Sequence, residues 1–332
     1  MNLRRTATSQ LLSVILLVLA SASALCASDN FAIQKIGDGV YAAIADPTNP
    51  RGKALSNSGF VITGDGVLVY DSHLTPEAAT ELIGEIHKVT DKPIRYLVNS
   101  HYHGDHTHGN QAFPASTEII SHHLTRRHLA EQEIPRLAQQ KRELPGRIAS
   151  ETDPARKAQL QEQLRQLERL EIILPTLTFE RSVILHRGGR ELQIFFFGRG
   201  HTDGDVVLYV PDQKIVFAGD LVFHKFIPYV GDGYLAEWQK TLEAVEQLGA
   251  KAYVPGHGAV TDAQGVAEFR GFLGDLLATV KPFVDRGATL VETQKQARVP
   301  EKYKDYGFQG TPFNLWPSCV ERAWHELKGE VK

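Results

Sequence analysis

The chain has 332 residues with 36 basic and 39 acidic side chains, so its formal net charge is only -3. This balance argues against nucleic acid as the main partner, because such a partner calls for a basic patch. Only 2 cysteines are present, which excludes a disulfide scaffold and a cysteine-rich zinc module, so histidine and carboxylate groups must hold any bound metal.

Residues 1–27 have the pattern of an export signal. Arg4 and Arg5 form a positive start, and the apolar run 11–20 is much shorter than the roughly 20 residues needed to span a bilayer. Small residues at 22–24 then fit a cleavage site. We therefore expect a periplasmic or secreted protein, with no stable membrane insertion after the signal is removed.

Short apolar runs separated by turn residues predict strands in the next part of the chain. Asp38-Gly39 and Asp65-Gly66 each stand between two such runs, which is typical of a hairpin. Pro76 begins an amphipathic helix over 76–88. The predicted strands are 31–36, 40–44, 60–62, 67–70, 94–98 and 119–120.

Residues 122–173 differ in composition, being rich in Arg, Glu, Gln and Leu. Breaks at Pro145-Gly146 and Asp153-Pro154 predict a helical hairpin whose second helix runs from Ala155 to about Ile172. Its charges are typical of a solvated surface, which favours a surface insertion over a partner-binding coiled coil.

Strands return after the insertion, and the tail from about residue 262 is mostly helical in pattern. No repeat or linker divides the chain, so residues 28–332 are expected to form one domain of the α/β (α+β) class. The order of elements predicts two mixed sheets packed together with helices outside. The predicted elements are strands 182–185, 192–197, 206–210, 215–218 and 252–254 and a helix over 235–248.

A dense group of metal-binding residue types follows the strand 94–98. In an extended segment, residues two apart point the same way, so His101 and His103 can converge on one metal. Gly104 lets the chain turn, and Asp105 and His106 then face a neighbouring point. One metal cannot easily take all four side chains from so short a segment, so the spacing favours two metals side by side.

Three later segments supply further donors, each at a predicted strand end and beside glycine, where the backbone can approach a site closely. These are His201, Asp220 and His257.

This order of motifs resembles the metallo-β-lactamase superfamily, in the form of an exported member. The resemblance covers most of the chain after the signal and implies a four-layer αββα sandwich with metals at one edge of the sheets. It implies a first metal site formed by His101, His103 and His201. It implies a second site formed by Asp105, His106 and His257, with Asp220 bridging the two.

Two Zn²⁺ per chain suit these ligands, and iron or manganese are possible alternatives. We hypothesise that a hydroxide shared by the two metals attacks a carbonyl carbon, while Asp105 orients it and takes its proton. The expected substrate is a small molecule with a cyclic amide, ester or thioester bond, β-lactams included. Asp220 weakens a dedicated lactamase interpretation, because the lactamase subclasses usually have Cys or Ser there.

Two alternatives come from other classes: a mononuclear iron enzyme resembling persulfide dioxygenases, and a non-catalytic binding protein that kept the fold. Three further polar residues are candidates for the site. His224 and Lys225 are candidate contacts for an anionic substrate, with exposed loop residues as the alternative. Asp71 is a candidate hydrogen-bond partner of a metal ligand, with a turn cap as the alternative.

Overall fold

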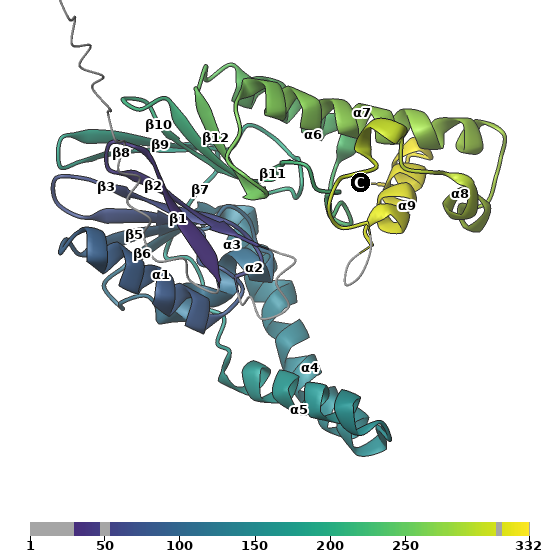
Figure 1. Ribbon diagram of the computed structural model, residues 1–332, viewed down its shortest axis with the longest axis horizontal. Helices are drawn as coiled ribbons and strands as arrows, with labels where there is room; N and C mark the ends of the chain where they lie inside the picture. Colours follow the sequence, from purple (N-terminus) through teal and green to yellow (C-terminus); the bar gives the residue numbers. More distant parts are fainter. Residues whose placement is uncertain (1–29, 47–53, 310–313, 332) are drawn as a thin grey trace, which may run out of the picture.

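The computed structural model describes residues 30–46, 54–309 and 314–331 (Figure 1). The predicted export signal, residues 1–27, lies outside the described residues. Within them, no helix has both the length and the apolar character needed to cross a bilayer.

The first sheet has seven strands in the order β1 to β7. Its first four strands pair antiparallel, and β4 to β7 pair in parallel. The Asp-Gly turns predicted two of these pairings, the β1–β2 and β3–β4 hairpins. The strands are β1 (Phe31–Gly37), β2 (Val40–Ala45), β3 (Ser58–Ile62), β4 (Val67–Tyr70), β5 (Ile94–Val98), β6 (Glu118–His122) and β7 (Leu177–Phe179).

The second sheet has five strands in the order β12-β11-β10-β9-β8, and only β11 and β12 are parallel. Its apolar inner face packs on that of the first sheet; Leu68 and Val98 share one core with Ile194 and Phe217. The strands are β8 (Ser182–Arg187), β9 (Arg190–Phe195), β10 (Val207–Val210), β11 (Ile215–Phe223) and β12 (Ala252–His257).

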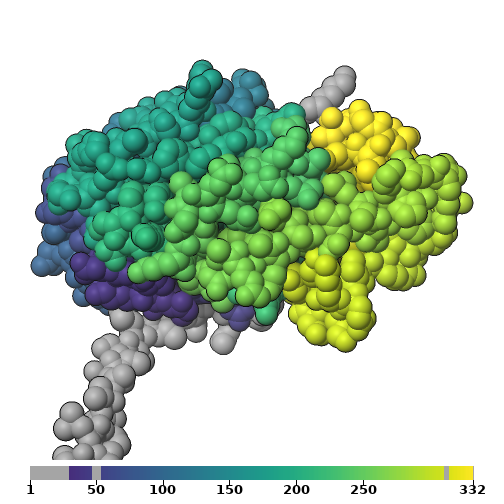
Figure 2. Space-filling model, turned by 90° about the horizontal axis from the view of Figure 1, so that it is seen from above, coloured from purple at the N-terminus to yellow at the C-terminus, as the bar shows by residue number. Residues whose placement is uncertain are grey.

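Helices cover the outer faces of both sheets (Figure 1). Leu82 and Ile86 of α1 (Pro76–Val89) pack against the first sheet. Trp238 of α6 (Leu235–Glu246) and Phe269 of α7 (Ala263–Asp285) pack against the second. The expected helix–sheet–sheet–helix sandwich is therefore confirmed. Two further helices, α8 (Leu290–Gln296) and α9 (Trp316–Leu327), lie at the end opposite the N-terminal strands (Figure 2).

The helical insertion is present and projects from the sandwich (Figure 1). It comprises α3 (His123–His128), a π-helical turn η2 (Leu129–Glu133), α4 (Ile134–Ser150) and α5 (Pro154–Arg169). The predicted break at Pro145-Gly146 is wrong, because α4 continues through it. A proline removes one helical hydrogen bond, and at this exposed position the rest of a 17-residue helix tolerates that loss. The hairpin turns at 151–153, where the Asp153 side chain caps α5.

Candidate metal centre

The predicted metal-binding side chains meet at one edge of the sandwich, where strands of both sheets end. β5 leads directly into His101 and His103, and the short helix α2 (Gly104–Thr107) presents Asp105 and His106. The second sheet contributes the other three, from the loop before β10, from β11 and from the end of β12: His201, Asp220 and His257.

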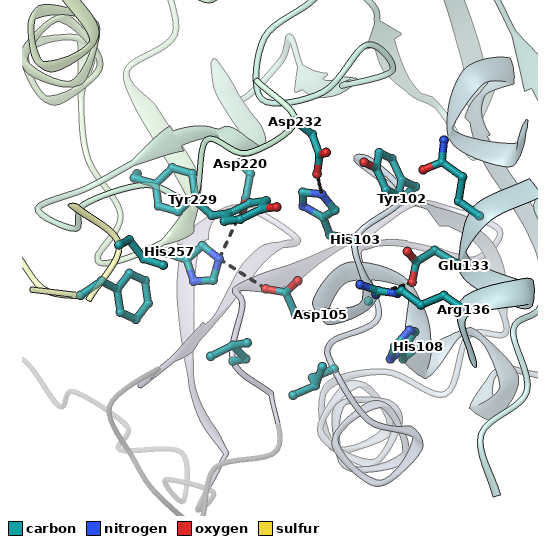
Figure 3. A pocket seen from close by; sticks show the side chains of 17 residues that line it. Tyr102, His103, Asp105, His108, Glu133, Arg136, Asp220, Tyr229, Asp232 and His257 are labelled. Atoms are coloured by element: carbon teal, nitrogen blue, oxygen red, sulfur yellow. Dashed lines mark hydrogen bonds and ion pairs between the residues drawn. The ribbon is translucent and has the colours of Figure 1, made fainter. Parts of the chain in front are cut away.

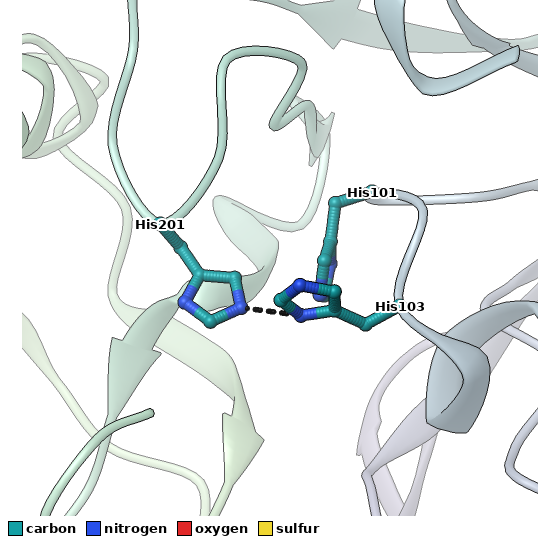
Figure 4. Close-up of side chains that lie close together, drawn as sticks. All are labelled: His101, His103 and His201. Atoms are coloured by element: carbon teal, nitrogen blue, oxygen red, sulfur yellow. Dashed lines mark hydrogen bonds between the residues drawn. The ribbon is translucent and has the colours of Figure 1, made fainter. Parts of the chain in front are cut away.

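His101, His103 and His201 form one group (Figure 4). Their ligand atoms all lie within 4.8 Å of one another, and His201 Nε2 is 2.9 Å from His103 Nδ1. Burial lowers the pKa of His101 well below its usual value and that of His201 to about 3. Both rings are therefore neutral at physiological pH, the form in which imidazole binds a metal.

Asp105, His106 and His257 form a second group, and Asp220 lies between the two groups. One Asp220 oxygen, Oδ2, is 3.3 Å from His201 Nε2 and 3.5 Å from His257 Nε2, while Oδ1 is 3.1 Å from His106 Nε2. Burial opposes ionisation of Asp220 and Asp105, but the neighbouring imidazoles outweigh it and lower both carboxyl pKa values. Both carboxylates are thus ionised and available as ligands.

The donor set fits metal ions. Buried polar atoms normally have a hydrogen-bond partner, and an unsatisfied one costs about 1–3 kcal/mol. In this centre His101 Nε2 is buried and has none, and His106 Nε2 and Asp220 Oδ1, 3.1 Å apart, are buried with no partner other than each other. Nitrogen and oxygen donors gathered in this way suit zinc, and also iron or manganese. The residues present therefore fit the metals that their pattern predicted.

Asp71 lies behind the second group. Its Oδ2 accepts a hydrogen bond from His106 Nδ1 at 2.8 Å, and its Oδ1 accepts one from the Ser100 backbone N–H at 2.7 Å. Ser100 Oγ in turn lies 2.9 Å from His101 Nδ1. These contacts occupy the δ nitrogens of His106 and His101, so the ε nitrogens face the centre.

A residue that sequence reasoning missed, Asp232, holds the third histidine. Its Oδ2 lies 2.9 Å from His103 Nε2, which leaves the δ nitrogen of His103 facing His201. Burial opposes ionisation of Asp232, but the hydrogen bond and charge of His103 lower its pKa to about 2. A signal did exist, because Asp232 stands between Gly231 and Gly233, in the same glycine-flanked pattern that marked His257.

The structure does not bring His224 and Lys225 to the centre. They line a separate surface hollow with Asp262 and Glu268. The reason lies in the backbone: His224 N–H bonds His257 O at the end of β12, and the chain then turns through a left-handed Lys225 (φ 61°). Neither residue lines the cavity over the ligand groups, and their contact with an anionic substrate stays a prediction.

A cavity of about 530 Å³ opens over the two groups (Figure 3). Its lining includes residues of the helical insertion and of the C-terminal segment. The polar lining residues include Tyr102, Gln132, Glu133, Arg136 and Asp232, and the apolar ones are Leu55, Leu74, Phe223, Phe308 and Leu315.

The chain is also similar in sequence to known proteins. A family model described as the metallo-beta-lactamase superfamily matches residues 51–257, more than half of the chain. A metallo-beta-lactamase type 2 from Elizabethkingia meningoseptica is 22% identical over 219 residues, which is 65% of this chain and 73% of that protein. A linear primary-alkylsulfatase from a Pseudomonas species is 23% identical over 268 residues, 73% of this chain and 50% of that protein.

Among solved structures, a metallo-beta-lactamase from Pontibacter korlensis superposes with a TM-score of 0.58 at 23% sequence identity. The superposition covers 74% of this chain and 100% of that one. At this level of identity the likeness concerns the fold.

Proposed function

Because the chain belongs to the metallo-beta-lactamase superfamily, which contains metal-dependent hydrolases, we propose that it is a zinc-dependent hydrolase of small molecules. The bond cleaved is a carbonyl bond in a cyclic amide, ester or thioester, and β-lactams belong to this class. The observation that carries the proposal is the arrangement of two groups of mostly buried donors, with Asp220 between them, beneath an open cavity.

The chain's residues divide the work of holding two zinc ions. His101, His103 and His201 would hold one ion, Asp105, His106 and His257 the other, and Asp220 would contact both. Zinc in such a centre polarises a carbonyl oxygen and makes water acidic, with a pKa of about 7. The division of ligands supports two metals rather than the single iron of a persulfide-dioxygenase-like enzyme.

Asp105 is the residue we assign to the attacking water. Its carboxylate is partly exposed to the cavity, and Oδ2 lies 3.4 Å from His257 Nε2 and 3.6 Å from His106 Nε2. A carboxylate with a lowered pKa stays ionised, so it accepts a hydrogen bond from water at neutral pH. Asp105 thereby orients the attacking water toward the substrate carbonyl.

We also propose that the protein works outside the cytoplasm on a small molecule. The support is the export pattern of residues 1–27 and the balanced charge, which does not suit nucleic acid.

The test is a hydrolysis screen of zinc-loaded protein with nitrocefin, lactones and thioesters, together with metal analysis of natively purified protein. We expect turnover of at least one class and two zinc ions per chain. His103→Ala and Asp105→Ala should lower turnover by roughly 100-fold or more without unfolding the chain. Exposed His186→Ala and Asp91→Ala are the matched controls. Full activity of His103→Ala, or one iron per chain, would contradict the proposal.

A further inference from the structure

The helical insertion reaches the cavity at a single place. The π-helical turn η2 and the first turn of α4 bring three polar side chains, Gln132, Glu133 and Arg136, to the cavity wall (Figure 3). Among the described residues that line this cavity, Arg136 is the only lysine or arginine.

Glu133 anchors the Arg136 guanidinium at the cavity mouth. Arg136 Nη2 lies 2.6 Å from Glu133 Oε2, and the glutamate side chain is 7% exposed whereas the arginine side chain is 59% exposed. A guanidinium has five N–H donors in a planar fork. The carboxylate contact uses one terminal nitrogen, so the Glu133 pair fixes the direction of the fork and leaves donors for a second acceptor.

Arg136 borders the same cavity as the candidate metal groups. It lies near His108, on the side of the cavity away from His257 (Figure 3). Its guanidinium is therefore available to a molecule that occupies the cavity.

The wall beside His257 is apolar. The Phe223 ring stacks on His257 with centroids 5.0 Å apart, and the Phe308 ring meets it edge-on at 5.7 Å. Leu315 adds to this wall. These rings lie beside His257, whereas Arg136 lies on the far side of Asp105 from His257 (Figure 3). The part of the cavity beside His257 is therefore apolar, and the part beside Arg136 carries a cation.

We infer that Arg136 is a specificity-determining residue that binds a carboxylate of the substrate. The substrate class is then a compound with an apolar group at one end, a carboxylate at the other and the scissile carbonyl between them. This inference rests on the proposed function for the carbonyl, while the anion subsite itself is a property of Arg136. A planar fork matches a carboxylate with two parallel hydrogen bonds, a geometry that a lysine ammonium does not reproduce.

A binding experiment on the zinc-loaded protein tests the subsite. Glutarate, adipate and suberate are each compared by calorimetric titration with their monoamides, which replace one carboxylate by a neutral amide. One carboxylate can occupy the metal centre in both compounds, so the affinity ratio within a pair reports the second group. We expect the unaltered protein to prefer at least one dicarboxylate by roughly fivefold or more.

Arg136→Gln should reduce this ratio about fivefold, and Arg136→Lys should restore part of it. The control is Arg142→Gln, an exposed arginine on the same helix that does not line the cavity, and it should keep the original ratio. Equal ratios in Arg136→Gln and Arg142→Gln would overturn the inference, as would an unaltered protein with no preference at any of the three lengths.

Failure of the inference can be separated from failure of the proposed function. The affinity ratio needs no turnover, so a protein that hydrolyses none of the screened compounds can still show a ratio that depends on Arg136. That result would reject the hydrolase and retain the subsite. Hydrolysis together with an affinity ratio that does not depend on Arg136 would support the hydrolase and reject the subsite. Thermal unfolding of Arg136→Gln checks that unpaired Glu133 has not destabilised the insertion.

Discussion

Three polar side chains hold the candidate ligand histidines through the ring nitrogen that faces away from the ligand groups. Asp71 contacts His106, Ser100 contacts His101 and Asp232 contacts His103, at 2.8, 2.9 and 2.9 Å. Such contacts fix the tautomer and the orientation of each ring, which preorganises the other ring nitrogen for binding a metal. The geometry of the candidate centre therefore depends on residues outside the candidate ligand set.

Asp232→Asn tests this dependence. An amide cannot stabilise His103 as a carboxylate does, so we expect zinc affinity to fall by roughly 10- to 100-fold. Competition with a chromophoric chelator measures the affinity. Asp203→Asn is the control, because Asp203 contacts His128 at 2.7 Å in a histidine–carboxylate pair outside the ligand groups. Equal zinc affinities in the two variants would show that Asp232 has no such role.

His73 should contribute to acid sensitivity. Burial lowers its pKa from 6.5 to about 4, opposed in part by the hydrogen bond to Ser56 O, and its ring stacks on Phe31. Because the folded-state pKa is lowered, the contribution is complete above pH 6.5 and is lost as pH falls toward 4. The folded and unfolded pKa values of His73 differ by about 2.5, from 6.5 to about 4. Each pKa unit corresponds to about 1.4 kcal/mol, so the contribution to the free energy of unfolding is about 3 kcal/mol.

His73→Asn is expected to weaken the pH dependence of the free energy of unfolding. Asparagine suits this position because it tolerates the left-handed backbone found there (φ 65°). Urea unfolding of chelator-treated protein at about pH 7.5 and about pH 4.5 measures the free energy of unfolding with metal release excluded. The deficit of the variant relative to the unaltered protein should narrow in acid. The exposed His186→Asn should leave the pH dependence unchanged.

The residues of the centre differ in how far they can be predicted from sequence. His101, His103, Asp105 and His106 follow one strand, so their convergence is a local property. Asp232 lies 129 positions from its partner His103, and only its flanking glycines marked it. His224 was close in sequence to Asp220 yet turned away, because backbone pairing with β12 decided its direction.

At the scale of elements, α6 depends on a cap supplied by another helix. Glu326 of α9 accepts hydrogen bonds from the backbone N–H groups of Leu235 and Ala236 at 2.7 and 2.8 Å. These N–H groups have no partner within the helix itself, and a carboxylate also suits the positive end of the helix dipole. Trp238 on this helix packs against His201, with centroids 5.4 Å apart, so the cap supports the candidate metal centre.

Glu326→Ala should therefore lower the free energy of unfolding by about 1–2 kcal/mol, with Glu326→Gln losing less. Chemical denaturation measures the loss. The matched control is Glu321→Ala, an exposed glutamate on the same helix. A loss in Glu321→Ala as large as that in Glu326→Ala would assign the effect to α9 itself rather than to the cap on α6.

Elements with a clear local pattern were predictable, and elements held by context were not. The strands flanking Asp-Gly turns and the helix beginning at Pro76 follow from short-range chemistry. The three-residue strand β7 was missed, because it exists only by pairing with β6. The π-helical turn η2 was also missed, and the Pro145 break was overestimated, since a long helix absorbs one lost hydrogen bond.

At the scale of the whole molecule, Asn57 joins the two sheets beside His257. Its Nδ2 donates to Pro255 O and Gly258 O at 2.8 and 2.7 Å, and its Oδ1 accepts from Ala45 N–H at 3.0 Å. The side chain is buried, so water cannot replace these partners.

Asn57→Leu should destabilise the protein by roughly 2–5 kcal/mol, because it leaves several buried backbone groups unsatisfied. Thermal unfolding measures the loss, and zinc titration should show weaker binding because His257 follows this junction. The control is Asn30→Leu, just before β1, where the side chain is partly buried and donates to the Glu81 carboxylate rather than to buried backbone groups. Stability unchanged in Asn57→Leu would mean that the sheets are held by their apolar core alone.

The sandwich as a whole was predictable from the alternation of strands and helices, and the cavity was not. Its walls come from loops and helices far apart in sequence, including Leu55, Arg136, Tyr229 and Phe308. Only tertiary packing brings these side chains together. The insertion was expected to be a surface feature that could also cover the site, and its first turns do line the cavity. That residues 28–332 form one domain stays a prediction.

Each candidate metal group takes ligands from both sheets, and this has a consequence for how the protein matures. The first group is complete only when residue 201 has been made, and the second only at residue 257. Tight binding also requires the docked sheets, so metal uptake and folding are linked, and each zinc ion would stabilise the folded chain. If the chain is exported as proposed, it folds outside the cytoplasm. The supply of zinc there, rather than in the cytoplasm where the chain is made, would decide how much active protein accumulates.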